Sequence, residues 1–442
     1  MQLPVTKIAK SRAALLTLAA AAAISACGGS STGPATAAPE PVVPPVVVPP
    51  SNFTISGTVS GLSGTVVLQN NAGTDVAISA NGTFTLPTTV PAGSTYSVAI
   101  SSQPFLEHCS VTNGSGTANA DVANISVSCT NSLVVSTVAG TGSVGSQDGP
   151  GATVTFSGPG GVAVKADGTI YVSEYNGGRL RKIAPDGVVS TLVASGLTDA
   201  VAVTLIGDDI YVVVSDNNQI VKIPSGGSPV VFAGSGLAGG ADAVGTAASF
   251  DRPYGMTSDS AGNLYVTEWR GNRIRKIAPD ATVTTVAGSG VAGFADASGS
   301  AAMFNAPWAI ALGADGNFYV GDYLNNRVRK ITPAGDVTTL AGSGSSISTD
   351  GTGTAAGFNS AAGITAAADG SLFVTEHSGH RVRKVTLGGV VTTVAGTGTG
   401  GGADGQAATA TFFTPSGIAA HPNGSLIVVE NGGNRVRAIK AQ

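Results

Sequence analysis

The sequence predicts an all-β protein in which a six-bladed β-propeller follows a small Ig-like β-sandwich. The first observation is a long repeat that begins near Val134 and continues to the C-terminus, with Arg273, Arg327, Arg381 and Arg435 each 54 residues after the last. The second is that each full repeat contains four strand-like runs. The third is a separate stretch of short alternating strands before the repeats. A fixed period of this size, rich in glycine and β-branched residues, is typical of propellers and other stacked repeats.

The composition fits an exported β-protein. At 442 residues the chain is long enough for two or three domains. Charged residues make up 11% of it, against about 25% in an ordinary globular protein, and glycine is abundant with 63 residues. The net charge of −4 provides no basic surface of the kind that nucleic-acid-binding proteins carry. We therefore expect no nucleic-acid partner.

Residues 1–26 are predicted to be a lipoprotein signal peptide. Three basic residues between positions 7 and 12 precede an apolar run at 13–24, which is too short to span a bilayer as a mature helix. The sequence Ile-Ser-Ala-Cys at 24–27 resembles the lipobox of bacterial lipoproteins. That resemblance implies that Cys27 is lipidated and becomes the new N-terminus. The alternative is an ordinary signal peptide with a cysteine near its cleavage site.

The same resemblance bears on location. Gly28 stands where such lipoproteins often carry an aspartate that retains them in the inner membrane, so a lipid anchor in the outer membrane of a bacterial cell envelope is favoured. Residues 27–51 are rich in Pro, Gly and Ser and are predicted to be a tether, flexible at first and then an extended polyproline spacer. The alternative use of the Pro-rich part is as a ligand for aromatic grooves.

Residues 52–131 are predicted to form the β-sandwich, because short alternating runs separated by Gly, Asn and Ser turns approach the seven-strand pattern of that fold. Cys109 and Cys129 are the two cysteines left once Cys27 is assigned to the lipid. In an exported protein they should form a disulfide, closing a loop of about 20 residues and contributing about 3 kcal/mol. We expect this domain to serve as a stalk or an adhesion-type spacer.

Residues 132–442 are predicted to form the propeller. In the fourth copy the strand-like runs are PWAIAL (307–312), NFYVGD (317–322), RVRKIT (327–332) and VTTLAG (337–342). Turn sequences join the last three runs as hairpins, and six copies of four antiparallel strands suit a six-bladed ring. An open solenoid would leave sheet edges exposed. The run at 134–140 matches a fourth strand that the last copy lacks, so it can close the ring.

The repeats resemble the NHL repeat. The shared pattern is seen in PSGIAA, NGSLIVVE and GNRVRAI (415–439), in RPYGMTS, AGNLYVTE and GNRIRKI (252–277), and in GPGGVAV, DGTIYVSE and GGRLRKI (158–183). The resemblance covers about 310 residues and implies an NHL-type propeller fold. It does not imply one function, because NHL propellers include lyases, sensor domains and binders of RNA or protein, and fold alone does not give function.

Each full repeat places an acid at the end of its second run and an arginine five residues later, and the short second copy has Val214 and Gln219 at these positions. The loss of both the acid and the arginine in the same copy favours structural ion pairs, because a partly buried charge without its partner is costly. The alternative is a ring of carboxylates that binds a divalent cation at the channel mouth, as in lactonase-type propellers. The predicted pairs are Glu174 with Arg179, Glu268 with Arg273, Asp322 with Arg327, Glu376 with Arg381, and Glu430 with Arg435.

Two further sets recur with the repeat. An aromatic residue before each first strand is expected to be core, and an aspartate in each long loop is expected to cap a turn through its side chain. The aromatic set is Phe156, Phe250, Phe304, Phe358 and Phe412, and the aspartate set is Asp148, Asp242, Asp296, Asp350 and Asp404.

A ligand-binding face is predicted where the long loops meet the ends of the second strands, since antiparallel order brings these segments to the same side. The aromatic residues expected there are Tyr175, Tyr254, Trp269, Trp308, Tyr323 and His377. The second copy is 14 residues shorter than the others, which predicts a notch beside Ser215, Asp216 and Asn217. Aromatic faces with a polar edge suit a sugar or a peptide. The alternative is that these aromatics merely cover the blade tops.

The predicted function is a non-enzymatic binding or scaffold module for an envelope glycan, peptide or protein, with no cofactor and no catalytic residue. His377 and His380 share one loop, but no third ligand follows at a zinc-like spacing, and no Gly-x-Ser-x-Gly elbow is found. The alternative is a metal-dependent hydrolase or lyase that holds a divalent cation on the carboxylates at the channel mouth.

The lipid anchor is directly testable. A Cys27→Ala protein should no longer incorporate labelled fatty acid and should leave the membrane fraction, because the acylated side chain is removed. Metabolic labelling and fractionation of cells expressing both proteins measure this. Continued labelling of the variant would show that Cys27 is not the lipidated residue.

Overall fold

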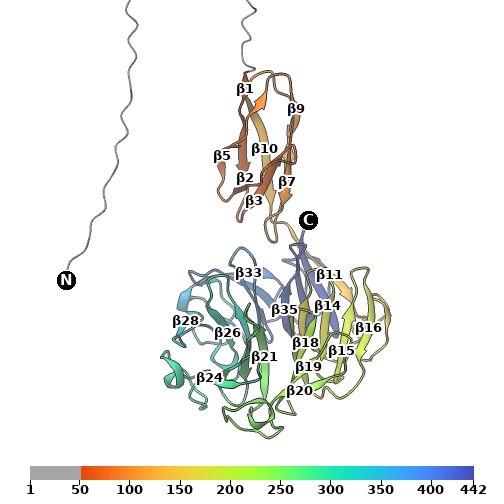
Figure 1. Cartoon of the computed structure of the whole chain (residues 1–442), viewed down its shortest axis with the longest axis vertical. Helices are drawn as coiled ribbons and strands as arrows, with labels where there is room; N and C mark the ends of the chain where they lie inside the picture. The colour runs from red at the N-terminus through yellow and green to blue at the C-terminus, as the bar shows by residue number, and fades with distance from the viewer. Residues whose placement is uncertain (1–50) are drawn as a thin grey trace, which may run out of the picture. The chain divides into compact units, whose positions relative to one another are not determined.

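The computed structural model describes residues 51–442, which are built of β-strands, 3-10 turns and loops (Figure 1). The predicted signal peptide, Cys27 and nearly all of the tether lie outside these described residues. Within residues 51–442 no helix is long and apolar enough to cross a bilayer. The prediction of an all-β protein is confirmed for this part of the chain.

The first ten strands form two four-stranded sheets and a two-stranded pair. One sheet has the order β5-β2-β10-β8, the other β4-β3-β7-β9, and β1 pairs with β6. Alternate residues of the strands are buried, and the buried side chains form one core that includes Ile55, Leu68 and Val127. The strands are β1 (Asn52–Phe53), β2 (Ile55–Ser60), β3 (Val66–Asn70), β4 (Val76–Ile78), β5 (Gly82–Thr85), β6 (Val90–Pro91), β7 (Thr95–Ser102), β8 (His108–Thr112), β9 (Ser115–Thr117) and β10 (Val122–Thr130).

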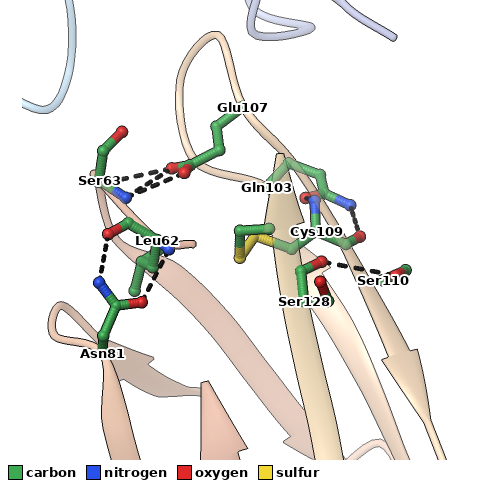
Figure 2. The surroundings of a disulfide bond; sticks show 10 residues. Leu62, Ser63, Asn81, Gln103, Glu107, Cys109, Ser110 and Ser128 are labelled. Atoms are coloured by element: carbon green, nitrogen blue, oxygen red, sulfur yellow. Dashed lines mark hydrogen bonds between the residues drawn. A yellow bond between two sulfur atoms is a disulfide. The ribbon is translucent and has the colours of Figure 1, made fainter. Parts of the chain in front are cut away.

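The predicted disulfide between Cys109 and Cys129 is confirmed. The two cysteines lie directly opposite each other on β8 and β10 (Figure 2). Beside them, the amide of Gln103 bonds the backbone of Cys109 twice, accepting from N–H at 2.7 Å and donating to the carbonyl at 2.9 Å. The buried carboxylate of Glu107 accepts a hydrogen bond from the backbone N–H of Ser63 at 2.9 Å. The disulfide and these bonds fasten the loop that leads into β8.

The rest of the chain forms six sheets of four or five strands, in chain order. In each, the first strand of the repeat contacts the first strand of the next sheet, and β35 of the last sheet contacts β13 of the first. The sheets therefore form a closed ring, the arrangement of a β-propeller.

The strands of the first three sheets are β12 (Gly149–Pro150), β13 (Pro159–Val164), β14 (Ile170–Glu174), β15 (Arg179–Ile183) and β16 (Val188–Val193); β17 (Ala200–Ile206), β18 (Asp209–Val214), β19 (Gln219–Ile223) and β20 (Val230–Ala233); and β21 (Pro253–Ser258), β22 (Leu264–Glu268), β23 (Arg273–Ile277) and β24 (Val283–Ala287). Short 3-10 turns lie at η1 (Gly245–Ala247), η2 (Gly299–Ala301), η3 (Tyr323–Asn325) and η4 (Gly353–Ala355).

The strands of the last three sheets are β25 (Pro307–Leu312), β26 (Phe318–Asp322), β27 (Arg327–Ile331) and β28 (Val337–Ala341); β29 (Gly351–Thr352), β30 (Ala361–Ala366), β31 (Leu372–Glu376), β32 (Arg381–Val385) and β33 (Val390–Ala395); and β34 (Gly405–Gln406), β35 (Pro415–Ala420), β36 (Leu426–Glu430) and β37 (Arg435–Ala441), which are joined by β11 (Leu133–Ala139).

The second strand of a repeat is buried on both faces, because each sheet packs between two neighbours. All five residues are buried in β22, β26, β31 and β36. Their sequences are runs of branched and aromatic residues that end in an acid, and such side chains suit a pleated, packed surface. The outer strand β33 instead exposes Val390 at its start. The acid at the end of each second strand is thus carried to one edge of its sheet, below the long loops.

The last sheet is completed by the strand that precedes all the repeats. β11 pairs antiparallel with β37, placing Val134 opposite Lys440 and Val135 opposite Ile439. This pairing agrees with the closure that the sequence predicts. Val135 is 2% exposed and packs in the same cluster as Val428 and Ile439. The first and last parts of the ring thereby share one sheet and one core.

A Val135→Asp substitution should lower the unfolding free energy by about 3 kcal/mol, because it puts an unpaired carboxylate into the closing core. The matched control is Val390→Asp on the outer strand β33, where the side chain is 42% exposed. Thermal unfolding measures both. Equal melting temperatures for the two variants would contradict a structural role for the closing strand.

Candidate ligand-binding face

Each full repeat contains a buried arginine that joins two acids. In the third sheet, Arg275 Nη1 lies 2.8 Å from Glu268 Oε1, and Nη2 lies 2.7 Å from Asp242 Oδ1. The same guanidinium donates to the carbonyls of Ser249 and Ala241 at 3.0 and 3.1 Å. It also lies 5.3 Å from the ring centre of Phe250. Arg275, Glu268 and Phe250 are all fully buried.

This Asp–Arg–acid cluster recurs in five of the six repeats. The arginine and the inner acid have fully buried side chains in every copy. The predicted phenylalanines are also fully buried, each with the arginine 5.0 to 5.6 Å from its ring centre. The clusters are Asp148–Arg181–Glu174, Asp242–Arg275–Glu268, Asp296–Arg329–Asp322, Asp350–Arg383–Glu376 and Asp404–Arg437–Glu430.

Two sequence interpretations need correction here. The arginine that neutralises each inner acid is two residues later than predicted. Two of the predicted pairs are present as longer, secondary ion pairs, with Arg179 3.9 Å from Glu174 and Arg273 3.8 Å from Glu268. In residues 51–442 no ion pair joins Asp322 to Arg327, Glu376 to Arg381 or Glu430 to Arg435. These three arginines donate to backbone carbonyls instead.

The physical reason is the two-residue period of a strand, which puts both arginines on one face and buries the later one more deeply. The sequence contained a signal for these arginines, because Arg181, Arg275, Arg329, Arg383 and Arg437 also recur, with Val221 in the second copy.

The second correction concerns the loop aspartates, which were expected to cap turns. Asp148 instead binds Arg181 and accepts hydrogen bonds from the backbone and hydroxyl of Thr191, both at 2.9 Å.

The second repeat has lost the whole cluster. Val214 and Val221 occupy the positions of the inner acid and the buried arginine, and both are buried. The loop between β16 and β17 is short and contains neither the cluster aspartate nor the phenylalanine. Apolar packing can replace a buried ion pair when all its members are removed together.

The inner acids therefore pair with arginines, which occupy the positions that a metal cation would need. Burial raises the pKa of Glu268 to about 7, while Arg275 and the N–H of Asp251 act in the opposite direction. Across residues 51–442 no group of three or more His, Cys, Asp or Glu side chains is placed to hold a metal. This geometry favours the structural interpretation of the carboxylates over the cation-binding one.

Five of the predicted aromatic residues meet at one mouth of the ring. The ring centre of Trp308 lies 4.5 Å from Tyr254, 4.7 Å from Tyr323 and 5.3 Å from His377. Tyr254 in turn lies 6.3 Å from Trp269. All five side chains are half-buried, so part of each remains open to solvent. We call this group the aromatic mouth.

Two polar atoms of the aromatic mouth are buried without a hydrogen-bond partner. They are Nε1 of Trp269 and Nδ1 of His377. Burial lowers the pKa of His377 to about 4, and the nearby His380 acts in the same direction, so the imidazole is neutral at pH 7. A buried polar atom without a partner is costly. The mouth thus contains hydrogen-bonding capacity that the protein itself does not use.

The sixth predicted aromatic, Tyr175, belongs to a charged group beside the mouth. Nη2 of Arg252 lies 3.1 Å from Asp199 Oδ2, 3.2 Å from Asp216 Oδ1 and 3.4 Å from the hydroxyl of Tyr175. The guanidinium also lies 5.5 Å from the ring of Trp269. Arg252 therefore connects the two acids to the aromatic mouth.

Sequence reasoning missed Asp199 and Arg252. Both occupy the position just before a first strand, where every repeat has a left-handed backbone with φ between 48° and 63°. The other four repeats carry uncharged residues there, namely Gly158, Ala306, Ser360 and Thr414. A charge at only two of six equivalent positions was the available signal.

The predicted notch lies on the other side of the short loop from where we expected it. A hollow of about 350 Å³ is lined by Tyr175, Asn176, Gly177, Gly178, Ser195, Gly196, Thr198 and Asp199. Ser215 and Asn217 do not line it; Ser215 is buried with an unpartnered hydroxyl, and Asn217 is exposed. The missing loop residues precede β17, so the space they leave opens toward the hairpin of the first repeat.

Known structures share this fold. A Bacteroides thetaiotaomicron protein of unknown function is 21% identical, with a TM-score of 0.60 over 86% of this chain and 90% of that one. An auxiliary nutrient binding protein from the same species is 16% identical, with a TM-score of 0.57 over 87% and 97%. At such identities the likeness shows the fold alone.

The relatives found by sequence are matched over only part of their own length. Teneurin-1 of Homo sapiens is 26% identical over 363 residues, which are 69% of this chain and 13% of the relative. Virginiamycin B lyase of Nocardia farcinica is 27% identical over 218 residues, covering 49% and 62%. The chain thus spans about an eighth of Teneurin-1, and no known family profile matches it. The chain has a propeller fold that proteins of differing function share.

The buried clusters predict an unusual pattern of stability. Arg275→Val should lower the unfolding free energy by about 3 to 5 kcal/mol, because it leaves the carboxylate of Glu268 buried without its partner. Adding Glu268→Val and Asp242→Ala should recover part of that loss, since the triple variant reproduces the second repeat. Urea unfolding measures both proteins. A triple variant less stable than the single one would contradict the structural role.

Proposed function

We propose that the chain is a lipid-anchored protein of the bacterial cell envelope whose six-bladed NHL-type propeller binds a ligand without transforming it. The observation that supports binding most directly is the aromatic mouth, in which Trp269 and His377 hold buried nitrogen atoms that lack hydrogen-bond partners. The anchor rests on Cys27 and the sequence around it. The ligand is a glycan, a peptide or an exposed segment of an envelope protein.

The chemistry of the mouth supports a ligand with flat faces and polar edges. Indole Nε1–H is only a donor, whereas a neutral imidazole nitrogen donates or accepts according to its tautomer. A ligand oxygen near Trp269 would remove the penalty of its unpaired donor, about 1 to 3 kcal/mol for a buried group. The half-exposed rings of Tyr254, Trp308 and Tyr323 offer apolar faces. A sugar ring or a peptide group meets both requirements.

The non-catalytic part of the proposal rests on where the titratable groups point. The inner acids bind arginines, and His377, which is neutral at pH 7, packs against the rings of Trp308 and Tyr323. A metal-dependent hydrolase or lyase would need carboxylates released from those arginines toward the channel. The auxiliary nutrient binding protein with the same fold offers a parallel for the binding of a ligand by such a propeller.

Intrinsic fluorescence can test the proposal, because the only two tryptophans of the chain, Trp269 and Trp308, both lie in the mouth. Envelope glycans and peptides should be screened for compounds that change the emission. For a compound so found, Trp308→Ala should weaken binding at least about tenfold, since a stacked aromatic contributes about 0.5 to 1.5 kcal/mol beyond its buried area. Isothermal calorimetry measures the affinity.

The matched control is Leu387→Ala, an exposed apolar residue in the turn between β32 and β33. That turn lies at the edge of its sheet opposite to the one that carries His377. The control should bind as the parent does. Equal binding by the parent, Trp308→Ala and Trp269→Phe, all folded, would refute the mouth as the binding site.

A further inference from the structure

We propose that the hollow beside the aromatic mouth binds a protonated amine, with the carboxylate of Asp199 as its anchor. This inference rests on the proposed ligand-binding function and names one chemical group of the ligand. The hollow is the space left by the shortened loop of the second repeat, between that loop and the hairpin of the first repeat. Its volume of about 350 Å³ accommodates an aminomethyl group or an amino sugar.

The lining of the hollow is suited to a cation. It contains one carboxylate, Asp199, and one aromatic ring, Tyr175, and it contains no lysine, arginine or histidine. The remaining lining consists of glycines and of the polar residues Asn176, Ser195 and Thr198. An ammonium group is stabilised both by a carboxylate and by the face of a tyrosine ring.

The charges around Arg252 do not balance. This single guanidinium pairs with two carboxylates, those of Asp199 and Asp216, whose side chains are 14% and 50% exposed. Within the described part of the chain no other cation lies within ion-pair distance of either acid. One negative charge beside the hollow therefore lacks a partner.

The titration of Asp199 agrees with this excess. Burial and the neighbouring carboxylate of Asp216 raise the pKa of Asp199 to about 6, although Arg252 opposes the shift. The free protein thus relieves the repulsion by taking up a proton as the pH falls. A ligand ammonium in the hollow would relieve it by supplying a positive charge.

The amine could come from an amino sugar or from a lysine-like side chain, and the test separates these sources. D-glucosamine is compared with D-glucose and with N-acetyl-D-glucosamine. Nα-acetyl-lysine methylamide is compared with its norleucine analogue. Calorimetry should show binding of at least one amine and at least tenfold weaker binding of its uncharged counterparts. The member of the pair that binds identifies the source.

Two variants locate the site. Asp199→Asn removes the anchor while Asp216 still pairs with Arg252, and Thr198→Phe fills the hollow from an exposed loop position without changing any charge. Each should weaken amine binding at least tenfold while the melting temperature stays near that of the parent. Asp280→Asn, an exposed turn aspartate that bonds the N–H of Thr282, is the charge-matched control and should bind normally.

Binding should also depend on pH with a defined sign. The titratable and charged groups that face Asp199 are Asp216, Arg252, Tyr175 and Tyr254. Because only ionised Asp199 attracts the ammonium, affinity should be full above its pKa of about 6. It should fall about tenfold between pH 7 and pH 5, as the acid takes up its proton. Asp199→Asn should abolish this dependence.

The outcomes separate this inference from the proposed function. If neither amine binds more tightly than its uncharged counterparts, or if amine binding is unchanged in both Asp199→Asn and Thr198→Phe, the amine site is overturned, even if Trp308→Ala shows that the mouth binds a ligand. Amine binding that requires Asp199 supports the inference, even if Trp308→Ala has no effect and the mouth assignment fails. Loss of amine binding in the Asp280→Asn control also overturns it, because general charge would then explain the attraction.

Discussion

The arrangement of the ring depends on one interaction, the buried guanidinium that joins two acids in five repeats. In the first repeat, Arg181 binds Glu174 at the end of the second strand and Asp148 in the long loop, and Asp148 in turn accepts hydrogen bonds from Thr191 on the outer strand. A loop and three strands are thereby fastened by one side chain. Because an unpaired buried charge is very costly, the cluster tolerates only complete presence or complete loss. In three repeats the residue directly after the inner acid, namely Trp269, Tyr323 or His377, belongs to the aromatic mouth.

The second repeat shows what complete loss allows. With Val214 and Val221 in place of the charges, the aspartate loop has nothing to bind, and a six-residue loop suffices between β16 and β17. The shorter loop leaves the hollow that Asp199 lines. A different ion pair, between Asp199 and Arg252, lies beside the mouth, close to Trp269. The repeat that contributes least to the common scaffold thus contributes most to the asymmetry of the proposed site.

Much of the fold could be predicted because it follows from period and pattern. Runs that alternate apolar and polar residues predicted the strands, and the two remaining cysteines predicted the disulfide. The unmatched run at 134–140 predicted the closing strand. The closest partner of each acid was missed, because Arg179 and Arg181 share a strand face and spacing alone does not say which is deeper. Asp199 and Arg252 were missed because a comparison of repeats emphasises what recurs. Their meeting requires two loops from neighbouring repeats, a contact that sequence spacing does not encode.

Loss of the buried cluster in the second repeat is what opens the proposed site. The most direct test is to restore the cluster while keeping Asp199, by grafting the loop at 234–251 in place of residues 194–198 together with Val214→Glu and Val221→Arg. The measurement is the affinity of the grafted protein for D-glucosamine or Nα-acetyl-lysine methylamide, whichever the parent binds. The account predicts a folded protein in which the hollow is filled and the amine affinity falls at least tenfold. A folded graft that binds the amine as tightly as the parent would contradict it.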